Sequence, residues 1–413
     1  MVPAVSSASS SGWAWKNKHV CRTKHDVPPH TGGLHARFRK CSHDPSHFRL
    51  LCAADRRYRN PGRRLGRRAA PGGSGHRGRH RDAGRFGDPE APWPFPVHRI
   101  TARLPGQLPV HPRAGQAIDR LLTRRHPRVV HVHLGAASPF AWAALACARR
   151  RGIPAVATIH SMWDPVVRCM YRLLSRTGHG PAAPVVVTTV SRSAARLVRQ
   201  ALPDLAPRVI PNGIDAAWWR TRAEVERQDG RVHVVAVGRL VPRKEPMELL
   251  AALHSAHTRM SRQGTALRAT FAGAGPSLRP IQRYLRRHHM DGWIRLVGRL
   301  QPREVRDLLS EADLFVNASC RESFGIAALE ARTSGLPVLA REHTGVADFV
   351  RHNREGALCG HSAFALADEV LWLARTPGAR RSLAAHNWET EPVHCTWPVV
   401  TDAFAHAYDD VAR

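Results

Sequence analysis

Residues 313–340 read DLFVNASCRESFGIAALEARTSGLPVLA, and this stretch decides the fold. Two short apolar runs, 313–316 and 337–340, flank a segment of helical periodicity that ends at Gly335. A strand, a helix and a second strand at this spacing form a βαβ unit, which belongs to a parallel sheet. The polar residues 321–330 then lie where the first strand ends and the helix begins. Open α/β sheets bind their ligands at such places.

The same alternation of β-branched runs with amphipathic stretches extends over most of the chain. We expect further strands at 128–133, 154–159, 184–190 and 208–210 and, after the polar stretch 220–230, at 232–237, 267–272 and 293–297. The predicted fold class is α/β, with two Rossmann-like doubly wound domains that face each other across a cleft. Residues 96–220 form the first domain and residues 231–385 the second.

Residues 1–95 form an irregular segment, in which long Arg/Gly/Pro-rich tracts such as 63–85 show hardly any apolar periodicity. Only 47–53 and the turn-rich residues 28–33 look like pieces of a domain. Two interpretations stay open. The segment is disordered, or its sequence has departed from an ancestral reading frame between about residues 35 and 92.

Composition bounds the class of protein. The 413 residues are 43% hydrophobic, no apolar run approaches the roughly 18 to 20 residues of a membrane span, and residues 1–18 are Ser-rich where a signal peptide is apolar. We therefore expect a cytoplasmic protein. The net charge of +31 is compatible with nucleic-acid binding, with an anionic membrane face or with a genome that favours arginine codons. Without interleaved aromatics, the basic residues favour the last two over specific nucleic-acid recognition.

The cysteines and acidic motifs give no sign of a metal centre. Eight cysteines without a CxxC pair indicate individual reduced thiols, and Cys41, His43, His47 and Cys52 cluster without the spacing of a known zinc finger. No DxD motif is present. We expect no essential metal and no cofactor besides a nucleotide-sugar co-substrate.

Two carboxylates stand eight residues apart in the polar stretch, Glu322 in a loop and Glu330 on the helix. At 3.6 residues per turn, Ser323, Ile326 and Glu330 share one face, which places Glu330 beside the loop of Glu322. Free N–H groups at the helix start attract phosphate oxygens, and carboxylates accept hydrogen bonds from vicinal hydroxyls. The alternative is a solvated Glu330 and a Glu322 that only complements the helix dipole.

The second domain opens with a strand that leads into GRLVPRK, residues 238–244. Gly238 lets a ligand approach the backbone, and Arg239 and Lys244, five residues apart, can reach one diphosphate. The alternative is a basic, solvated helix start, in which Arg243 is also mere surface charge.

In order and spacing, residues 96 to about 400 resemble the retaining glycosyltransferases of family 4. The resemblance rests on Glu322 to Glu330 with SFG between them, on Gly238-Arg239 with Lys244, and on PNGID at 211–215. It implies a GT-B fold, with the donor bound mainly by the second domain and the acceptor by the first. It also implies that residues 386–413 end in a helix that returns to the first domain.

The resemblance assigns roles to individual residues. It implies that Arg239 and Lys244 contact the donor diphosphate and that Glu322 holds hydroxyls of the transferred sugar. The remaining donor-binding residues it implies are the amides of Ser323, Phe324 and Gly325, the ribose-binding Glu330, and Val297 and Gly298 at the base.

The first domain contributes a histidine and a loop. His160 ends the strand at 154–159 and resembles the active-site histidine of the family, whereas His133, at the end of a neighbouring strand, ranks lower. Gly32 and Gly33 match the glycine-rich loop that passes the donor phosphates and the acceptor. The turn at 211–215 is placed near the interdomain crossover, where Gly213 is free to take positive φ.

The resemblance therefore implies a retaining hexosyltransferase that uses a UDP- or GDP-sugar and an unidentified hydroxyl acceptor. A lipid-linked or anionic acceptor at the inner face of the membrane would suit the basic chain. An epimerase or hydrolase on this fold would need a water-activating group that the sequence does not reveal. A non-catalytic remnant or basic binding protein is favoured by residues 1–95 and opposed by the intact motifs of the second domain.

Overall fold

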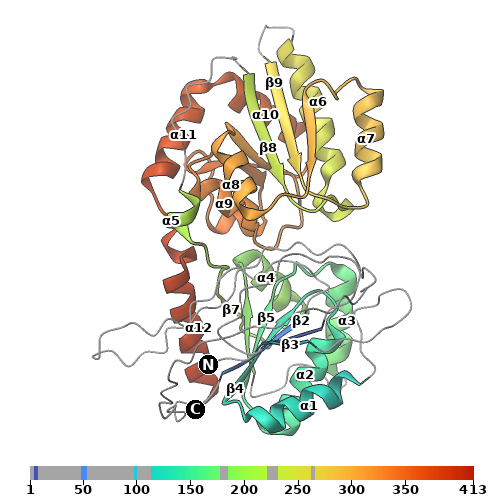
Figure 1. Ribbon diagram of the computed structural model, residues 1–413, viewed down its shortest axis with the longest axis vertical. Helices are drawn as coiled ribbons and strands as arrows, with labels where there is room; N and C mark the ends of the chain where they lie inside the picture. Colours follow the sequence, from blue (N-terminus) through green and yellow to red (C-terminus); the bar gives the residue numbers. More distant parts are fainter. Residues whose placement is uncertain are drawn as a thin grey trace, which may run out of the picture.

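The computed structural model describes residues 113–176, 185–220, 231–261 and 266–413, together with the backbone of three strands near the N-terminus. Two α/β units lie one above the other, each with a central sheet between helices (Figure 1). The fold class predicted from the sequence is confirmed.

The lower unit in Figure 1 holds a seven-stranded sheet of order β3-β1-β2-β4-β5-β6-β7. Its strands are β1 (Ala4–Ser7), β2 (Phe48–Ala53), β3 (Val97–Arg99), β4 (Val129–Leu134), β5 (Ala155–Ile159), β6 (Val185–Thr189) and β7 (Arg208–Val209). Its helices are α1 (Ala114–Arg125), α2 (Pro139–Arg150), α3 (Pro165–Arg176) and α4 (Arg192–Ala201). The strands β4 to β7 are parallel and agree with the four predicted segments to within two residues.

The N-terminal edge of this sheet departs from the prediction. The strand β2 runs antiparallel to both β1 and β4, and β1 was not expected. A parallel pair needs a crossover, usually a helix, and the sequence of residues 8–47, which connect β1 to β2, shows no amphipathic stretch that could supply one.

The upper unit holds a six-stranded parallel sheet of order β10-β9-β8-β11-β12-β13. Its strands are β8 (Arg231–Val237), β9 (Ala266–Ala272), β10 (Ile294–Gly298), β11 (Leu314–Asn317), β12 (Val338–Arg341) and β13 (Gly356–Cys359). Its helices are α6 (Pro246–Ser261), α7 (Leu278–Arg287), α8 (Pro302–Ser310), α9 (Ile326–Thr333), α10 (Ala363–Arg375) and α11 (Pro377–Glu389). The strand order reverses between β8 and β11, and a crevice forms at such a switch point.

Both faces of this sheet are buried against helices. On one face Leu250, Leu253 and Met260 of α6 pack with residues of α7 and α10, and on the other Phe315 packs with Leu329 of α9. Full burial of each such side chain contributes about 1.5 to 3 kcal/mol, so the sheet is a firm base for the loops at its carboxyl edge.

Within the described residues, the chain crosses between the two units at two places, and these two segments touch. Ile214 N–H donates to the Cys395 carbonyl at 2.7 Å, just before α5 (Ala216–Trp219) and α12 (Trp397–Val411). The helix α12 packs on β5 and β6 of the first unit. Gly213 was expected to have a positive φ, but its φ is not positive. It is needed because a Cβ there would come within 2.3 Å of the Trp397 ring.

Further contacts join the units beside the crossings. The 3-10 turns η2 (Pro242–Lys244), η3 (Gly345–Asp348) and η4 (Val393–Cys395) complete the described elements. Asp348 of η3 accepts from the backbone N–H of Arg192 at 2.8 Å, and Ser193 Oγ donates to the Thr344 carbonyl at 3.2 Å. The N-terminal end of α4 is thereby fixed to the second unit.

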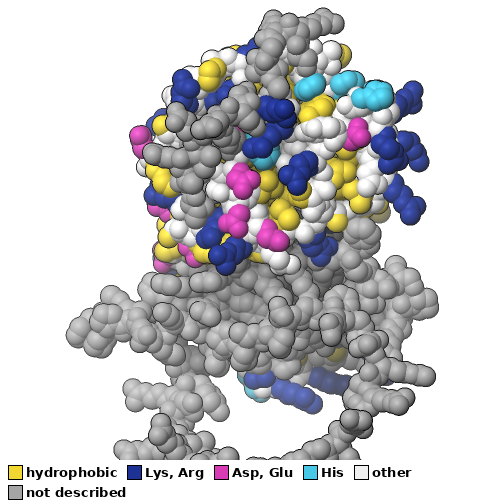
Figure 2. All heavy atoms as spheres, turned by 45° about the horizontal axis from the view of Figure 1, so that its top comes forward, with side chains coloured by type: hydrophobic (Ala, Val, Ile, Leu, Met, Phe, Trp, Pro, Cys, Tyr) yellow, Lys and Arg dark blue, Asp and Glu magenta, His cyan; other side chains and the backbone are white. Residues whose placement is uncertain are grey.

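Charge is dispersed over the visible face of the second unit. Dark blue Lys and Arg side chains lie among hydrophobic and acidic ones and do not form a single stripe (Figure 2). Within the described ranges, no helix is both long and apolar enough to span a bilayer.

Candidate active site

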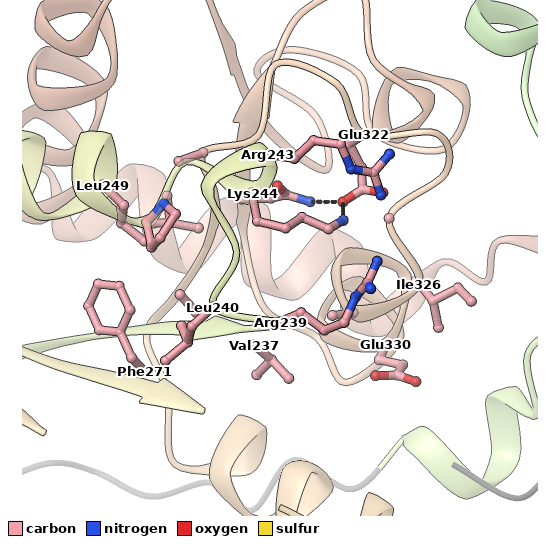
Figure 3. Close-up of a pocket in the computed structure, with 18 of the residues that line it drawn as sticks. Val237, Arg239, Leu240, Arg243, Lys244, Leu249, Phe271, Glu322, Ile326 and Glu330 are labelled. Atoms are coloured by element: carbon pink, nitrogen blue, oxygen red, sulfur yellow. Dashed lines mark hydrogen bonds and ion pairs between the residues drawn. The ribbon is translucent and has the colours of Figure 1, made fainter. Parts of the chain in front are cut away.

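A pocket lies at the switch point between β8 and β11, where the sequence placed the ligand. It is lined by the strand ends, by the loop from Gly238 to Lys244, and by the start of α9 (Figure 3). The predicted donor residues Gly238, Arg239, Lys244, Glu322, Ser323, Gly325 and Glu330 all line it.

The loop before α9 is fixed by its own packing. Phe324 is fully buried against Phe349, and the carbonyl of Glu322 accepts from Gly345 N–H at 2.8 Å. Gly325 is the N-cap of α9 at φ +89°, where a Cβ would lie 2.6 Å from Val346 Cγ2. Ser323 therefore belongs to the loop and not to the helix, so the predicted helix face shared by Ser323, Ile326 and Glu330 is wrong for Ser323, although all three residues line the pocket.

An ion pair crosses the pocket between Lys244 Nζ and Glu322 Oε2. The Glu322 side chain is 6% exposed and that of Lys244 is 24% exposed. The amide Nδ2 of Asn317 also donates to Glu322 Oε2, at 3.2 Å. The sequence analysis missed Asn317, whose only signal was a polar residue directly after a buried strand.

The two loops that carry this pair are tied together. Ser319 Oγ donates to the Arg243 carbonyl at 3.1 Å, and the N–H of Cys320 donates to Glu245 Oε2 at 3.0 Å. Glu245 has φ +52° and was also missed, because its role depends on a loop 75 residues away. The separation of Lys244 from Glu322 is thus set by hydrogen bonds that tie the backbone of each loop to a side chain of the other.

Arg239 and Glu330 line the same pocket. The side chain of Arg239 extends from the end of β8 toward the side on which Glu330 lies (Figure 3). Glu330 is 1% exposed, so it is not the solvated helix residue of the alternative interpretation. Arg243 also lines the pocket, so its charge is not confined to the outer surface.

Val297 and Gly298 end β10, two strands away, and do not line this pocket. The N–H of Gly273 donates to the Gly298 carbonyl at 2.6 Å, and the N–H of Gly238 donates to the Ala272 carbonyl at 2.9 Å. Three strand ends therefore lie side by side at the carboxyl edge of the sheet, with a glycine on each.

His160 follows β5 at the carboxyl edge of the first sheet. Its Nε2 lies 2.7 Å from Nδ1 of His133, the second-to-last residue of the neighbouring β4. Nearby, the Asp164 carboxylate is 3.9 Å from the Arg321 guanidinium, next to Glu322. The structure thus brings the segment after His160 to the donor loop of the second unit.

Gly32 and Gly33 lie outside the described residues, as do the side chains of the Cys41 to Cys52 cluster. In the part of the chain with described side chains, no three His, Cys, Asp or Glu residues are grouped to hold a metal ion.

Two family models match consecutive parts of the chain. Glycosyltransferase Family 4 matches residues 69–218, and Glycosyl transferases group 1 matches residues 219–387. The chain belongs to glycosyltransferase family 4. The match to this family begins at residue 69, whereas the pattern of strands and helices in the sequence predicted that the first domain begins at residue 96.

Individual relatives agree with the family. Glycogen synthase from Mycobacterium tuberculosis is 33% identical over 315 residues, which cover 72% of this chain and 72% of that protein. The GDP-mannose-dependent alpha-(1-6)-phosphatidylinositol monomannoside mannosyltransferase from the same species is 28% identical over 341 residues, 76% of this chain and 84% of that one. The Anabaena HepE structure in complex with UDP-glucose has a TM-score of 0.62 at 18% identity, covering 76% and 86%. The fold is therefore GT-B.

Proposed function

We propose that this glycosyltransferase is a retaining hexosyltransferase whose donor is a UDP- or GDP-hexose. The observation that carries the proposal is the Lys244–Glu322 pair inside a pocket that Arg239 and Glu330 also line. The pocket holds cations that suit a diphosphate and carboxylates that suit sugar hydroxyls. These are the two halves of a nucleotide sugar.

The proposed assignment follows the positions of these groups. Arg239 and Lys244 contact the diphosphate, and the residues at the start of α9, whose N–H groups lack partners within the helix, line the same pocket. A diphosphate that draws Lys244 away leaves the Glu322 carboxylate to accept hydroxyls of the hexose. Glu330 takes the ribose, and Val297 and Gly298 meet the base through their backbone.

The bond to the anomeric carbon breaks with its electrons going to the diphosphate oxygen. Arg239 and Lys244 stabilise this charge as it grows, and loss of one such preorganised contact typically costs about 3 to 4 kcal/mol of barrier. In the proposal the leaving phosphate takes the proton of the attacking acceptor hydroxyl on the same face of the sugar, so configuration is retained. These cations perform the neutralisation that a metal performs in other transferases.

Residues 231–385 act as the donor domain, residues 96–220 as the acceptor domain, and residues 386–413 as the helix that returns to it. The acceptor is a hydroxyl on a lipid-linked or anionic molecule at the inner face of the membrane. Basic residues in the last turns of α1 and α2 support an anionic partner, as do relatives named for phosphatidylinositol acceptors.

The test is titration of the full-length protein with UDP-glucose, GDP-mannose and the free nucleotides by calorimetry. We expect one nucleotide class to bind, and Lys244→Ala and Glu330→Gln to weaken it at least tenfold. Exposed Arg287→Ala and Glu391→Gln are controls that remove the same charges elsewhere. If no nucleotide binds, the donor assignment is wrong and the chain is a non-catalytic binding protein.

Transfer is tested separately by nucleotide release during incubation with the donor that binds. Glu322→Gln should bind the free nucleotide normally but release less than a tenth as much from the nucleotide sugar. An anomeric product of inverted configuration in an NMR assay of the transferred sugar would contradict the retaining mechanism.

A further inference from the structure

A stripe of polar side chains follows one face of the first sheet. His131 and His133 are two residues apart on β4 and so share a face, and Thr158 and His160 share the same face at the end of β5. The register pairs His133 with Thr158, and the N–H of His160 continues the ladder by donating to the Leu134 carbonyl at 2.9 Å. Strand geometry therefore places the two pairs of side chains next to each other.

The contact between His133 and His160 is a ring-to-ring hydrogen bond. Nδ1 of His133 and Nε2 of His160 are 2.7 Å apart, and the ring centroids are 5.0 Å apart. A neutral imidazole has one N–H and one lone pair, so one ring donates and the other accepts. Because His160 uses Nε2 here, any contact between His160 and a substrate must use Nδ1.

The bond couples the proton states of the two rings. If His133 donates, His160 carries its own proton on Nδ1 and is a donor toward a substrate. If His160 donates from Nε2, its Nδ1 is an acceptor. A proton on all four nitrogens would place two cations in contact, which their repulsion opposes. The tautomer that His160 presents is thus a property of the pair.

The deeper part of the stripe is rigid and neutral. His131 is bonded to Thr158 Oγ1 at 2.7 Å and to the hydroxyl of Tyr408 on α12 at 2.8 Å, and its ring lies against that of His133. Burial lowers the pKa of His131 to about 3. His133 therefore rests on a fixed, uncharged support.

We propose that His133 is a positioning residue that fixes the ring orientation and the tautomer of His160 for its contact with the sugar or the acceptor. The proposal rests on the proposed sugar transfer and on the resemblance of His160 to the active-site histidine of the family. Misplacement of such a group by 1 Å can cost about a hundredfold in rate, so the effect belongs in kcat and not in donor affinity. The donor pocket belongs to the other domain, and its lining does not include His133.

The experiment compares His133→Asn with His133→Leu in the full-length protein. An Asn amide can place a polar atom where Nδ1 of His133 lies, whereas Leu fills the space without a hydrogen bond. For the donor nucleotide sugar that binds, we expect His133→Leu to lower the rate of nucleotide release at least tenfold, with an unchanged Kd. His133→Asn should recover most of the loss. Equal losses in both variants would overturn the proposal.

A second measurement, by NMR, tests the hydrogen bond between His133 and His160 without an activity assay. In 15N-histidine-labelled protein, the imidazole signals of His160 are assigned by their absence in His160→Gln. We expect the Nε2 signal to shift in His133→Leu and to return toward the wild-type value in His133→Asn, while the melting temperature of the two variants agrees. A His160 signal unaffected by His133→Leu would refute the coupling. If the shift is seen but no nucleotide sugar binds, the proposed function fails and the pairing stands.

Discussion

Replacement of Lys244 by Met and of Glu322 by Gln, singly and together, tests whether the pocket is held ready by its own ion pair. The two single changes leave different groups behind. In Lys244→Met a carboxylate that is only 6% exposed stays in place, supported by Asn317 Nδ2 at 3.2 Å. In Glu322→Gln the ammonium that stays is 24% exposed and can be hydrated.

The magnitudes follow from this asymmetry. Breaking a fully buried pair costs about 3 to 5 kcal/mol, and the partial exposure of Lys244 reduces that. We expect Lys244→Met to lower the free energy of unfolding by about 2 kcal/mol and Glu322→Gln by less than about 1 kcal/mol. The double variant should regain most of the Lys244→Met loss, because no buried charge then lacks its partner.

The affinities of the three variants for the donor should not follow the order of their stabilities. A lost charge-assisted contact costs about 1.5 to 3 kcal/mol, so Lys244→Met and the double variant should bind the nucleotide roughly tenfold to a hundredfold more weakly. Glu322→Gln should bind the free nucleotide normally and lose affinity only for the nucleotide sugar.

Urea unfolding followed by tryptophan fluorescence gives the stabilities, and calorimetry gives the affinities. A double variant as unstable as Lys244→Met would show that the two side chains are not energetically paired. Unchanged nucleotide affinity in Lys244→Met would refute the diphosphate assignment.

Four further outcomes are expected. Gly325→Ala should lower the free energy of unfolding by about 2 kcal/mol in urea, because of its φ of +89° and the nearby Val346, and neutral behaviour would contradict the geometry. Burial lowers the pKa of His131 from 6.5 to about 3, so stability should fall as pH drops from about 6.5 toward 3, and His131→Asn should remove about one proton from that slope. Burial alone would raise the pKa of Glu355, but hydrogen bonds from Arg351 outweigh it, and the pKa falls from 4.5 to about 2. The stability that the ionised Glu355 contributes above pH 4.5 should therefore be lost as the pH falls toward 2, and Glu355→Gln should make the melting temperature less dependent on pH in that range. Gly238→Ala should keep the melting temperature and weaken nucleotide binding at least tenfold in calorimetry.

Much of the second domain could be read from the sequence. The strands predicted at 293–297 and 337–340 became Ile294–Gly298 and Val338–Arg341. The second of them is buried throughout, and buried parallel strands are nearly continuous apolar runs in the sequence. The strand β13, Gly356–Cys359, was missed, since its four residues GALC include no β-branched side chain. The donor carboxylates and cations were predicted to lie together because all of them follow strand ends at one edge of one sheet.

What the sequence could not give are contacts that depend on register and on loop packing. Asn317 and Glu245 act through loops distant in the chain, and nothing local marks them. The bond from His133 to His160 joins residues 27 apart and requires that β4 and β5 be neighbours in one register. The antiparallel β2 is a similar case, because strand direction is decided by the connection and not by the strand itself.

The glycines at the three strand ends separate what the fold requires from what a ligand requires. A Cβ on Gly273 would come within 1.8 Å of the Gly238 carbonyl oxygen, and its φ is +154°, so packing alone demands glycine there. Gly298 has φ +71°, which also favours glycine. Gly238 has neither constraint, since a Cβ would meet no atom of the chain within 4 Å and its φ is not positive. Glycine at 238 therefore has no explanation in the packing, whereas a diphosphate held against the backbone between Arg239 and Lys244 would exclude any side chain there.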